Sequence, residues 1–206
     1  MEHPVWTFDS RNDEGDVIHY EKMNNLYVAG IDSIDLGMDD TSALTKDPSS
    51  FCIVIKKRAI GLSEPKYVAI YKERPNDIRD AYKTAIKLLQ YYNCKANLEA
   101  TRVSMLSWAR EKKYLNYFMY RPIATYPAGN NPKRRTIGTP ASVAIIDHQT
   151  DLIRDYVNDF CHNIWFEDML DELSRYTDEN KRKFDIIAAM GLCELGDEDM
   201  MGVTPK

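Results

Sequence analysis

Three acidic residues stand at positions from which carboxylates can meet and bind divalent cations. Asp32 and Glu99 each end a short apolar run, and Asp185 opens a stretch of small and apolar residues. Carboxylate oxygens are hard ligands that suit Mg²⁺ and Mn²⁺, and Mg²⁺ needs few of them because it keeps several of its waters. The sequence therefore predicts an oxygen-lined metal site built from three distant segments.

Each of these acids, taken alone, also has a purely structural explanation. Asp32 could be a turn residue at the end of a strand, since aspartate is common in turns. Glu99 and Asp185 could each stand at the start of a helix, where the helix dipole favours an anion. The metal site is the preferred interpretation because three acids, and not one, stand at the ends of predicted strands or at the start of a predicted helix.

Basic side chains that could contact phosphate lie in two regions. Lys133, Arg134 and Arg135 form a short run in the loop 124–139, which has the length of a functional loop. Arg102 follows Glu99 closely and could extend a cationic track. A run of three charges is also common on an ordinary solvated surface, so this alternative stays open.

The elements that must position these side chains alternate in a regular order. We expect helices at 103–113, 140–160, 167–175 and 183–195, a further helix capped by Asn76, and strands at 26–32, 51–57, 66–73, 96–99 and 117–121. The first three strands indicate an antiparallel meander, and the later alternation of strand and helix implies parallel pairing. The predicted fold class is therefore α/β, with a five-stranded mixed sheet flanked by helices.

Length and composition restrict the class of protein. A chain of 206 residues that is 44% hydrophobic can bury the core of one domain, which we place at 25–206 after a hairpin or linker at 1–24. No apolar run approaches the roughly 18 residues of a membrane span, and the first residues do not form a signal peptide. We therefore expect a cytosolic protein with no membrane partner. The net charge of −5 argues against a protein that coats nucleic acid, but a local basic site is compatible with it.

Cysteine and histidine spacing argues against a transition-metal site. The four cysteines lie far apart without a C-x-x-C pair, so we expect reduced core residues. The four histidines show no H-x-x-x-H spacing, and we expect them to be surface or capping residues.

The order of elements and acids resembles the ribonuclease H-like nuclease fold. Four short motifs are more closely similar to the nuclease domain of the large terminase subunit of tailed bacteriophages. They are Val28-Ala29-Gly30-Ile31-Asp32, Asp40-Thr41-Ser42-Ala43, Asn97-Leu98-Glu99 and Phe184-Asp185-Ile186-Ile187. The resemblance covers residues 25–195, and its specificity comes from the order and spacing of the motifs.

This resemblance implies a metal-dependent endonuclease that cleaves double-stranded viral DNA during genome packaging. Asp32, Glu99 and Asp185 match the catalytic, metal-binding triad of that family, and Asp40 matches an accessory metal-binding acid. Two Mg²⁺ or Mn²⁺ ions about 3.5–4 Å apart would activate a water on one side of a phosphodiester and stabilise the leaving oxygen on the other.

The sequence departs from the family pattern at one position. The family often has two adjacent aspartates on its final helix, and Phe184 takes the place of the first. A metal bound through Asp185 alone on that helix could be held more weakly. It could also borrow a carboxylate from elsewhere, for which the candidates are Asp178, Glu179 and Asp35.

The resemblance also implies partners and a location. Complete proteins of the family carry an ATPase domain with a G-x-x-x-x-G-K-[ST] loop, which this sequence lacks, so we expect the chain to correspond to the C-terminal half. The ATPase domain, the small terminase subunit and the capsid portal would be its partners. It would act in the cytoplasm of an infected bacterium and transiently at the procapsid portal.

Two other functions stay open at this stage. One is another ribonuclease H-like nuclease, such as a junction resolvase or an integrase. The other is a non-catalytic module that docks to DNA or to the packaging motor, with Phe184 as a sign of a decayed site.

Overall fold

A four-stranded mixed sheet forms the centre of the protein. The computed structural model describes residues 3–4, 6–8, 20–22, 24–34, 49–127, 134–181 and 183–201. The sheet has the order β5-β4-β3-β6, made of β3 (Tyr27–Asp32), β4 (Phe51–Lys57), β5 (Lys66–Glu73) and β6 (Lys95–Leu98). The three strands β3, β4 and β5 pair antiparallel, whereas β6 pairs parallel with β3. The expected antiparallel meander with a parallel addition is therefore confirmed.

The prediction of a fifth strand at 117–121 is wrong. This segment starts inside a 3-10 helix, η2 (Leu115–Tyr117), and its strand pairing is limited to two isolated bridges, Ala96↔Phe118 with β6 and Tyr120↔Ile137 with a residue outside the sheet. Pro122 follows at once and lacks the N–H that a longer ladder needs. The 3-10 turn before the segment and the proline after it reduce the expected strand to single bridges.

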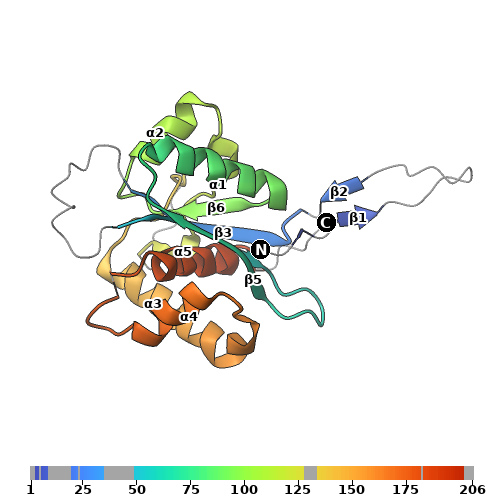
Figure 1. Cartoon of the computed structure of the whole chain (residues 1–206), viewed down its shortest axis with the longest axis vertical. Helices are drawn as coiled ribbons and strands as arrows, with labels where there is room; N and C mark the ends of the chain where they lie inside the picture. Colours follow the sequence, from blue (N-terminus) through green and yellow to red (C-terminus); the bar gives the residue numbers. More distant parts are fainter. Residues whose placement is uncertain are drawn as a thin grey trace, which may run out of the picture.

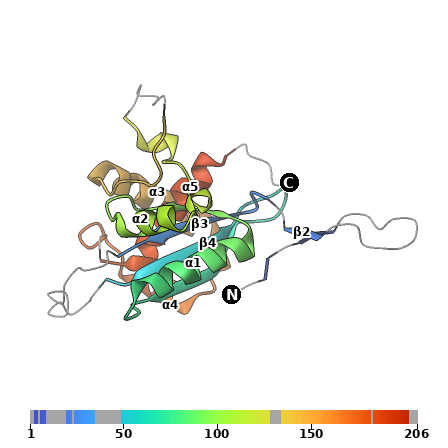
Figure 2. The ribbon, with the colours of Figure 1, turned by 90° about the horizontal axis from the view of Figure 1, so that it is seen from above.

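In the part of the chain that the structure describes, five α-helices cover the two faces of the sheet. They are α1 (Ile78–Tyr92), α2 (Ser104–Glu111), α3 (Val143–Phe160), α4 (Glu167–Arg175) and α5 (Asp185–Asp199). Helices α1 and α2 lie on one face and α5 lies on the other, with α3 and α4 outside α5 (Figures 1 and 2). All five helices match the expected ones within a few residues, but the cap of α1 is Asp77 rather than Asn76, because the Asp77 carboxylate accepts the N–H of Arg79.

Alternating residues of the strands belong to two separate hydrophobic cores. On β3, Tyr27, Ala29 and Ile31 join the core beneath α1 and α2, whereas Val28 joins the core beneath α5. A strand that is buried on both faces reads as a continuous apolar run, which explains why β3 was visible in the sequence. Three of the four cysteines are buried, and the exposed Cys161 corrects the expectation that all four belong to a core.

Helix α5 is buried nearly all round, as expected for a helix that lies between a sheet and two other helices. Its backbone reaches β3 at Gly30. A Cβ atom added at Gly30 would lie 1.9 Å from the carbonyl oxygen of Ala189 and 2.4 Å from the nitrogen of Cys193. The missing side chain at Gly30 and the small Ala189 therefore allow this helix to pack closely on the sheet.

The N-terminal region contains two short strands, β1 (Trp6–Phe8) and β2 (Tyr20–Lys22), which pair antiparallel. Among the described residues, no helix combines the length and apolar character that a bilayer span requires.

Candidate metal centre

The end of β3 and the end of β6 bring the first two acids to the same sheet edge. Asp32 is the last residue of β3, and Glu99 follows Leu98, which pairs with Ile31. The N–H of Glu99 donates to the carbonyl of Ile31 at 3.2 Å, so the two chains stay in register up to the acids. Adjacent residues of paired strands point to the same face. Asp32 and Glu99 therefore project together toward the α5 side.

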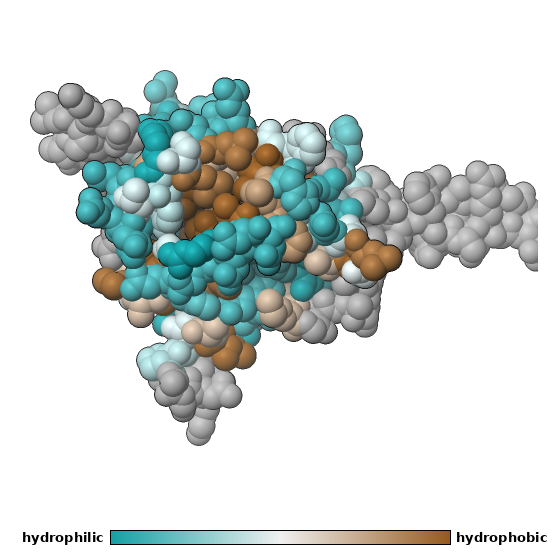
Figure 3. Space-filling model, turned by 90° about the horizontal axis from the view of Figure 1, so that it is seen from below, coloured by the Kyte–Doolittle hydropathy of each residue, from teal (hydrophilic) through white to brown (hydrophobic). Residues whose placement is uncertain are grey.

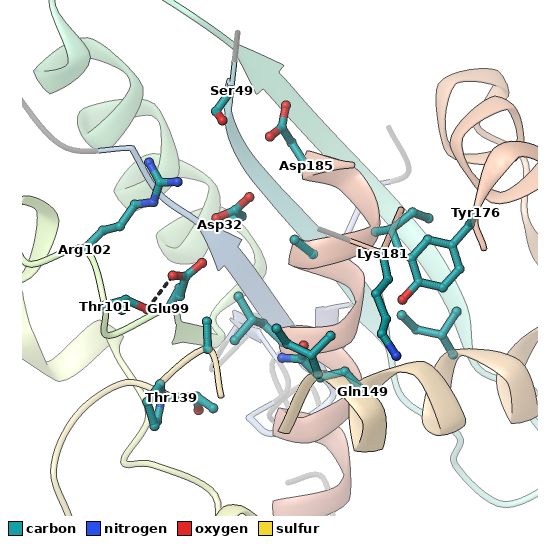
Figure 4. A pocket seen from close by; sticks show the side chains of 17 residues that line it. Asp32, Ser49, Glu99, Thr101, Arg102, Thr139, Gln149, Tyr176, Lys181 and Asp185 are labelled. Atoms are coloured by element: carbon teal, nitrogen blue, oxygen red, sulfur yellow. Dashed lines mark hydrogen bonds between the residues drawn. The ribbon is translucent and has the colours of Figure 1, made fainter. Parts of the chain in front are cut away.

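The third acid comes from the first turn of α5. Asp185 lines the same pocket as Asp32 and Glu99, and its Oδ2 accepts the N–H of Ser50 at 3.0 Å. Figure 4 shows Asp32 between the other two carboxylates, with Arg102 facing them from the side of Glu99. The three acids that the sequence singled out are thus brought together at one sheet edge.

The surroundings of Asp32 favour its protonated form. Burial raises the pKa of Asp32 well above its usual value, and the negative charges of Glu99 and Asp185 and a hydrogen bond with Glu99 raise it further. The positive charge of Arg102 offsets only part of this effect. Like charges around Asp32 destabilise its carboxylate. A cation bound beside it would offset this repulsion and so lower the free energy of the site.

The pKa of Asp185 is raised as well, but more of the effect is offset by neighbouring groups. Burial raises its pKa, while the N–H of Ser50 and the ammonium of Lys72 lower it again without cancelling the effect. The Lys72 Nζ lies 3.6 Å from Asp185 Oδ2 and 2.7 Å from Glu172 Oε1. The carboxylate of Asp185 is therefore better stabilised than that of Asp32.

The donor set fits a hard divalent cation, since the converging side chains offer carboxylate oxygens and no thiolate or imidazole. No three His, Cys, Asp or Glu side chains of the described residues lie close enough to form a ready-made site for one ion. Because Mg²⁺ takes one or two carboxylates and completes its shell with water, pairs of these acids suffice. Asp32 lies between the other two acids, so one pair would be Asp32 with Glu99 and another Asp32 with Asp185.

Of the further carboxylates considered from the sequence, Asp178 and Glu179 do not line this pocket. Asp178 is exposed and lies 3.6 Å from Lys181, and Glu179 is exposed as well. Phe184 packs its ring against Tyr176 and receives Arg175 over its face. Asp35 and Asp40 lie outside the described residues.

The candidate cationic residues are distributed differently from the acids. Arg102 lines the pocket, and Arg134 is exposed. The guanidinium of Arg135 donates to the carbonyl of Arg121 and pairs with Asp199 at 2.5 Å, so it has a structural role away from the acids. Lys133 lies outside the described residues.

The residues that the sequence analysis missed include Lys72 and Glu172, which lie beside the start of α5, and Thr101, which donates to Glu99. A signal for Glu172 was present, because it lies three residues after Met169 and four before Tyr176, on the inward face of α4. Lys72 faces the site because it pairs with Cys52, which in turn pairs with Asp32. This cross-strand register depends on how β3, β4 and β5 pair, which no short stretch of sequence shows.

The pocket continues from the acids into an apolar part, and its whole volume is about 530 Å³. Apolar side chains from α3 and α5 line this part: Ile146, Ile153, Ile187, Ala188 and Leu192. The face that carries α3 and α4 shows apolar side chains gathered in a hollow between hydrophilic ridges (Figure 3). The acids therefore lie at the polar end of a partly apolar pocket.

Comparison with known proteins adds no family to this description, since neither a protein-family model nor a curated protein matches the chain.

Proposed function

We propose that the protein is a divalent-metal-dependent endonuclease with a ribonuclease H-like fold that cleaves double-stranded DNA. The observation that carries the proposal is the convergence of Asp32, Glu99 and Asp185, which come from three distant segments, in one pocket at a sheet edge. The mixed sheet with helices on both faces and the order of the four motifs support the same assignment.

Within this fold class, the motifs favour the nuclease domain of a phage terminase. The ATPase domain, the small terminase subunit and the portal would then be its partners, in an infected bacterial cell and at the procapsid portal. We propose these partners on the resemblance of the motifs alone.

The chain's own residues have distinct roles in the proposed reaction. Asp32 and Glu99 would hold one Mg²⁺ or Mn²⁺ and Asp32 and Asp185 a second, and the bound ions would supply an activated water and positive charge at the leaving oxygen. The Thr101 hydroxyl donates to Glu99 Oε1 at 2.5 Å and orients that carboxylate. Arg102 lies where it can contact the phosphate of the substrate.

The test is cleavage of supercoiled plasmid by the purified protein with Mg²⁺ or Mn²⁺. We expect nicked and linear products in the presence of either ion and none in EDTA. Asp32→Asn and Glu99→Gln should each lower the rate by at least about 100-fold, because the transition-state charge loses its metal. Asp80→Asn is the matched control, since Asp80 is an exposed aspartate of α1 that pairs with Lys83. Cleavage by either site variant at the wild-type rate would refute the proposal.

A second candidate function is a non-catalytic DNA-docking or motor-docking module. Two observations favour it: no three acids of the described residues form a ready-made metal group, and Asp185 Oδ2 is already bound by Ser50 and near Lys72. Calorimetry with Mn²⁺ separates the two functions. A nuclease should bind Mn²⁺ in a manner that Asp32→Asn abolishes, whereas a docking module should show no binding that depends on these acids.

Another ribonuclease H-like nuclease, such as a junction resolvase, is distinguished by its substrate. It should cleave a branched duplex faster than a linear duplex of the same sequence. Equal rates on both substrates would favour the terminase assignment.

A further inference from the structure

The first turn of α5 receives its cap from another helix. Phe184 stands at the N-cap position and makes no side-chain capping bond, so the free N–H groups of the turn need other acceptors. The buried carboxylate of Glu172, on α4, supplies one: its Oε2 accepts the N–H of Ile186 at 3.0 Å and that of Ile187 at 3.2 Å. The start of α5 is therefore fixed to α4 through one side chain.

The second oxygen of the same carboxylate binds the lysine that approaches Asp185. Glu172 Oε1 accepts from Lys72 Nζ at 2.7 Å, and that nitrogen lies 3.6 Å from Asp185 Oδ2. Lys72 belongs to β5, so Glu172 joins α4, α5 and the sheet at one point. A residue that touches three elements around one side chain can determine how that side chain is oriented.

The resulting contacts leave Asp185 with one occupied oxygen. Every contact that the described residues make with its carboxylate involves Oδ2, which accepts the N–H of Ser50 and lies near Lys72. Within the described part of the chain, Oδ1 makes no hydrogen bond or ion pair. A carboxylate held in this way offers a single oriented oxygen, and orienting contacts of this kind typically change metal affinity by about 10–100-fold.

We propose that Glu172 is a positioning residue for Asp185, which it orients toward the pocket by capping α5 and holding Lys72. This inference rests on the proposed function only where it concerns the metal. The position of Asp185 in the metal-free protein is a separate property of the fold, and it has its own measurement.

The first measurement is the amide resonance of Ser50 in the metal-free protein, followed by ¹H–¹⁵N NMR. The Ser50 N–H donates to Asp185, whereas the hydrogen bonds of Glu172 with described residues go to Lys72, Ile186 and Ile187. We expect Glu172→Gln to shift this amide proton upfield, because a displaced Asp185 accepts a weaker hydrogen bond. Glu167→Gln, an exposed glutamate of the same helix, should leave it in place. Ile86→Val, a buried change on α1, controls for lost stability alone. A Ser50 resonance that is the same in all three variants overturns the proposal.

The second measurement is the affinity for Mn²⁺, by calorimetry. We expect Glu172→Gln to bind about 10–100-fold more weakly than wild type, with Glu167→Gln unchanged. Equal affinity of Glu172→Gln and wild type overturns the proposal. If wild type itself does not bind Mn²⁺, the proposed function fails, and the Ser50 resonance still decides whether Glu172 positions Asp185.

A further variant covers the case in which Glu172→Gln does not fold. Lys72→Met removes the ammonium next to Asp185 but leaves the cap of α5 intact. It should change the chemical shift of the Ser50 amide, because Asp185 loses the ammonium that lies beside its Oδ2. A Ser50 resonance at the wild-type position would overturn the proposal.

Discussion

At the scale of single residues, the carboxyl group of Asp32 is kept at a cost to stability. Its pKa is raised by burial and by the charges of Glu99 and Asp185, so the folded protein binds a proton there more tightly than the unfolded chain does. Stability then decreases as the pH rises from the unfolded pKa, about 4, through the raised folded pKa. This direction is opposite to that of an ion-paired aspartate.

The first prediction follows from that sign. Asp32→Asn should raise the unfolding temperature in EDTA at pH 8, where each 1 kcal/mol appears as about 2–4 °C, and the difference should disappear toward pH 4. Thermal unfolding followed by circular dichroism across this range measures it. Asp80→Asn serves as the control and should show no such dependence. An Asp32→Asn protein that is less stable than wild type at pH 8 would contradict the claim that burial and the charges of Glu99 and Asp185 destabilise the ionised Asp32.

The sequence identified the three acids but not their partners, for a physical reason. Asp32 and Glu99 were recognisable because each directly follows an apolar run, which is a local pattern. Lys72 and Glu172 contact the site through cross-strand register and through the packing of α4 on α5, and neither is encoded within a short window. The Arg135 side chain likewise has a partner, Asp199, that is 64 residues distant.

At the scale of elements, the contact between β3 and α5 sets the position of the third acid. Gly30→Ala should prevent the native contact, because the new methyl group would meet backbone atoms of α5 that cannot move aside. We expect a loss of more than about 3 kcal/mol or a failure to fold, at or beyond the usual range for an overpacked core. Gly196→Ala is the matched control, since its Cβ would meet the ends of the side chains of Val28 and Met119 at 3.0 and 3.1 Å. Chemical denaturation compares the two, and equal stabilities would show that this contact is not tight.

The other end of α5 is fixed by a buried ion-pair network. Lys56 Nζ lies 2.5 Å from Glu194 and 2.9 Å from Asp197, and Tyr67 donates to Glu194 as well. Lys56→Met should cost about 3–5 kcal/mol, because it leaves a buried carboxylate without its cation. The double variant Lys56→Met, Glu194→Met should recover part of this loss. Urea denaturation measures both, and a double variant as unstable as the sum of the single changes would contradict the pairing.

The pattern of apolar residues predicted the existence and type of nearly all the elements, and it failed where two local signals competed. Residues 117–121 are rich in aromatic side chains, which favours a strand. Pro122 and the tight turn before the segment limit it to isolated bridges. The expected cap of α1 was Asn76 and the observed cap is Asp77. Both residue types favour the N-cap position and they are adjacent, so the sequence does not distinguish them.

At the scale of the whole molecule, the two cores define one folding unit that begins at β3. Within the described residues, the clusters on the two faces of the sheet start at Leu26 and Val28. Of the described residues before Leu26, His3 contacts Tyr91 and Asn24 contacts Asn93 at exposed positions, the carbonyl of Asn25 accepts from Arg58, and Pro4 is buried. We therefore expect a chain that starts at residue 24 to fold without the N-terminal region.

The last prediction tests this boundary between the regions 1–24 and 25–206. The shortened chain should unfold cooperatively within about 4 °C of the full chain, which corresponds to roughly 1 kcal/mol for a protein of this size. It should also keep the increase in stability produced by Asp32→Asn at pH 8, because that effect depends on the sheet edge and α5 alone. Differential scanning calorimetry of the four proteins, with each length carrying either Asp32 or asparagine, measures both quantities. A shortened chain that loses cooperative unfolding would show that the N-terminal strands contribute to the core, and that the site depends on a larger unit than the sheet and its five helices.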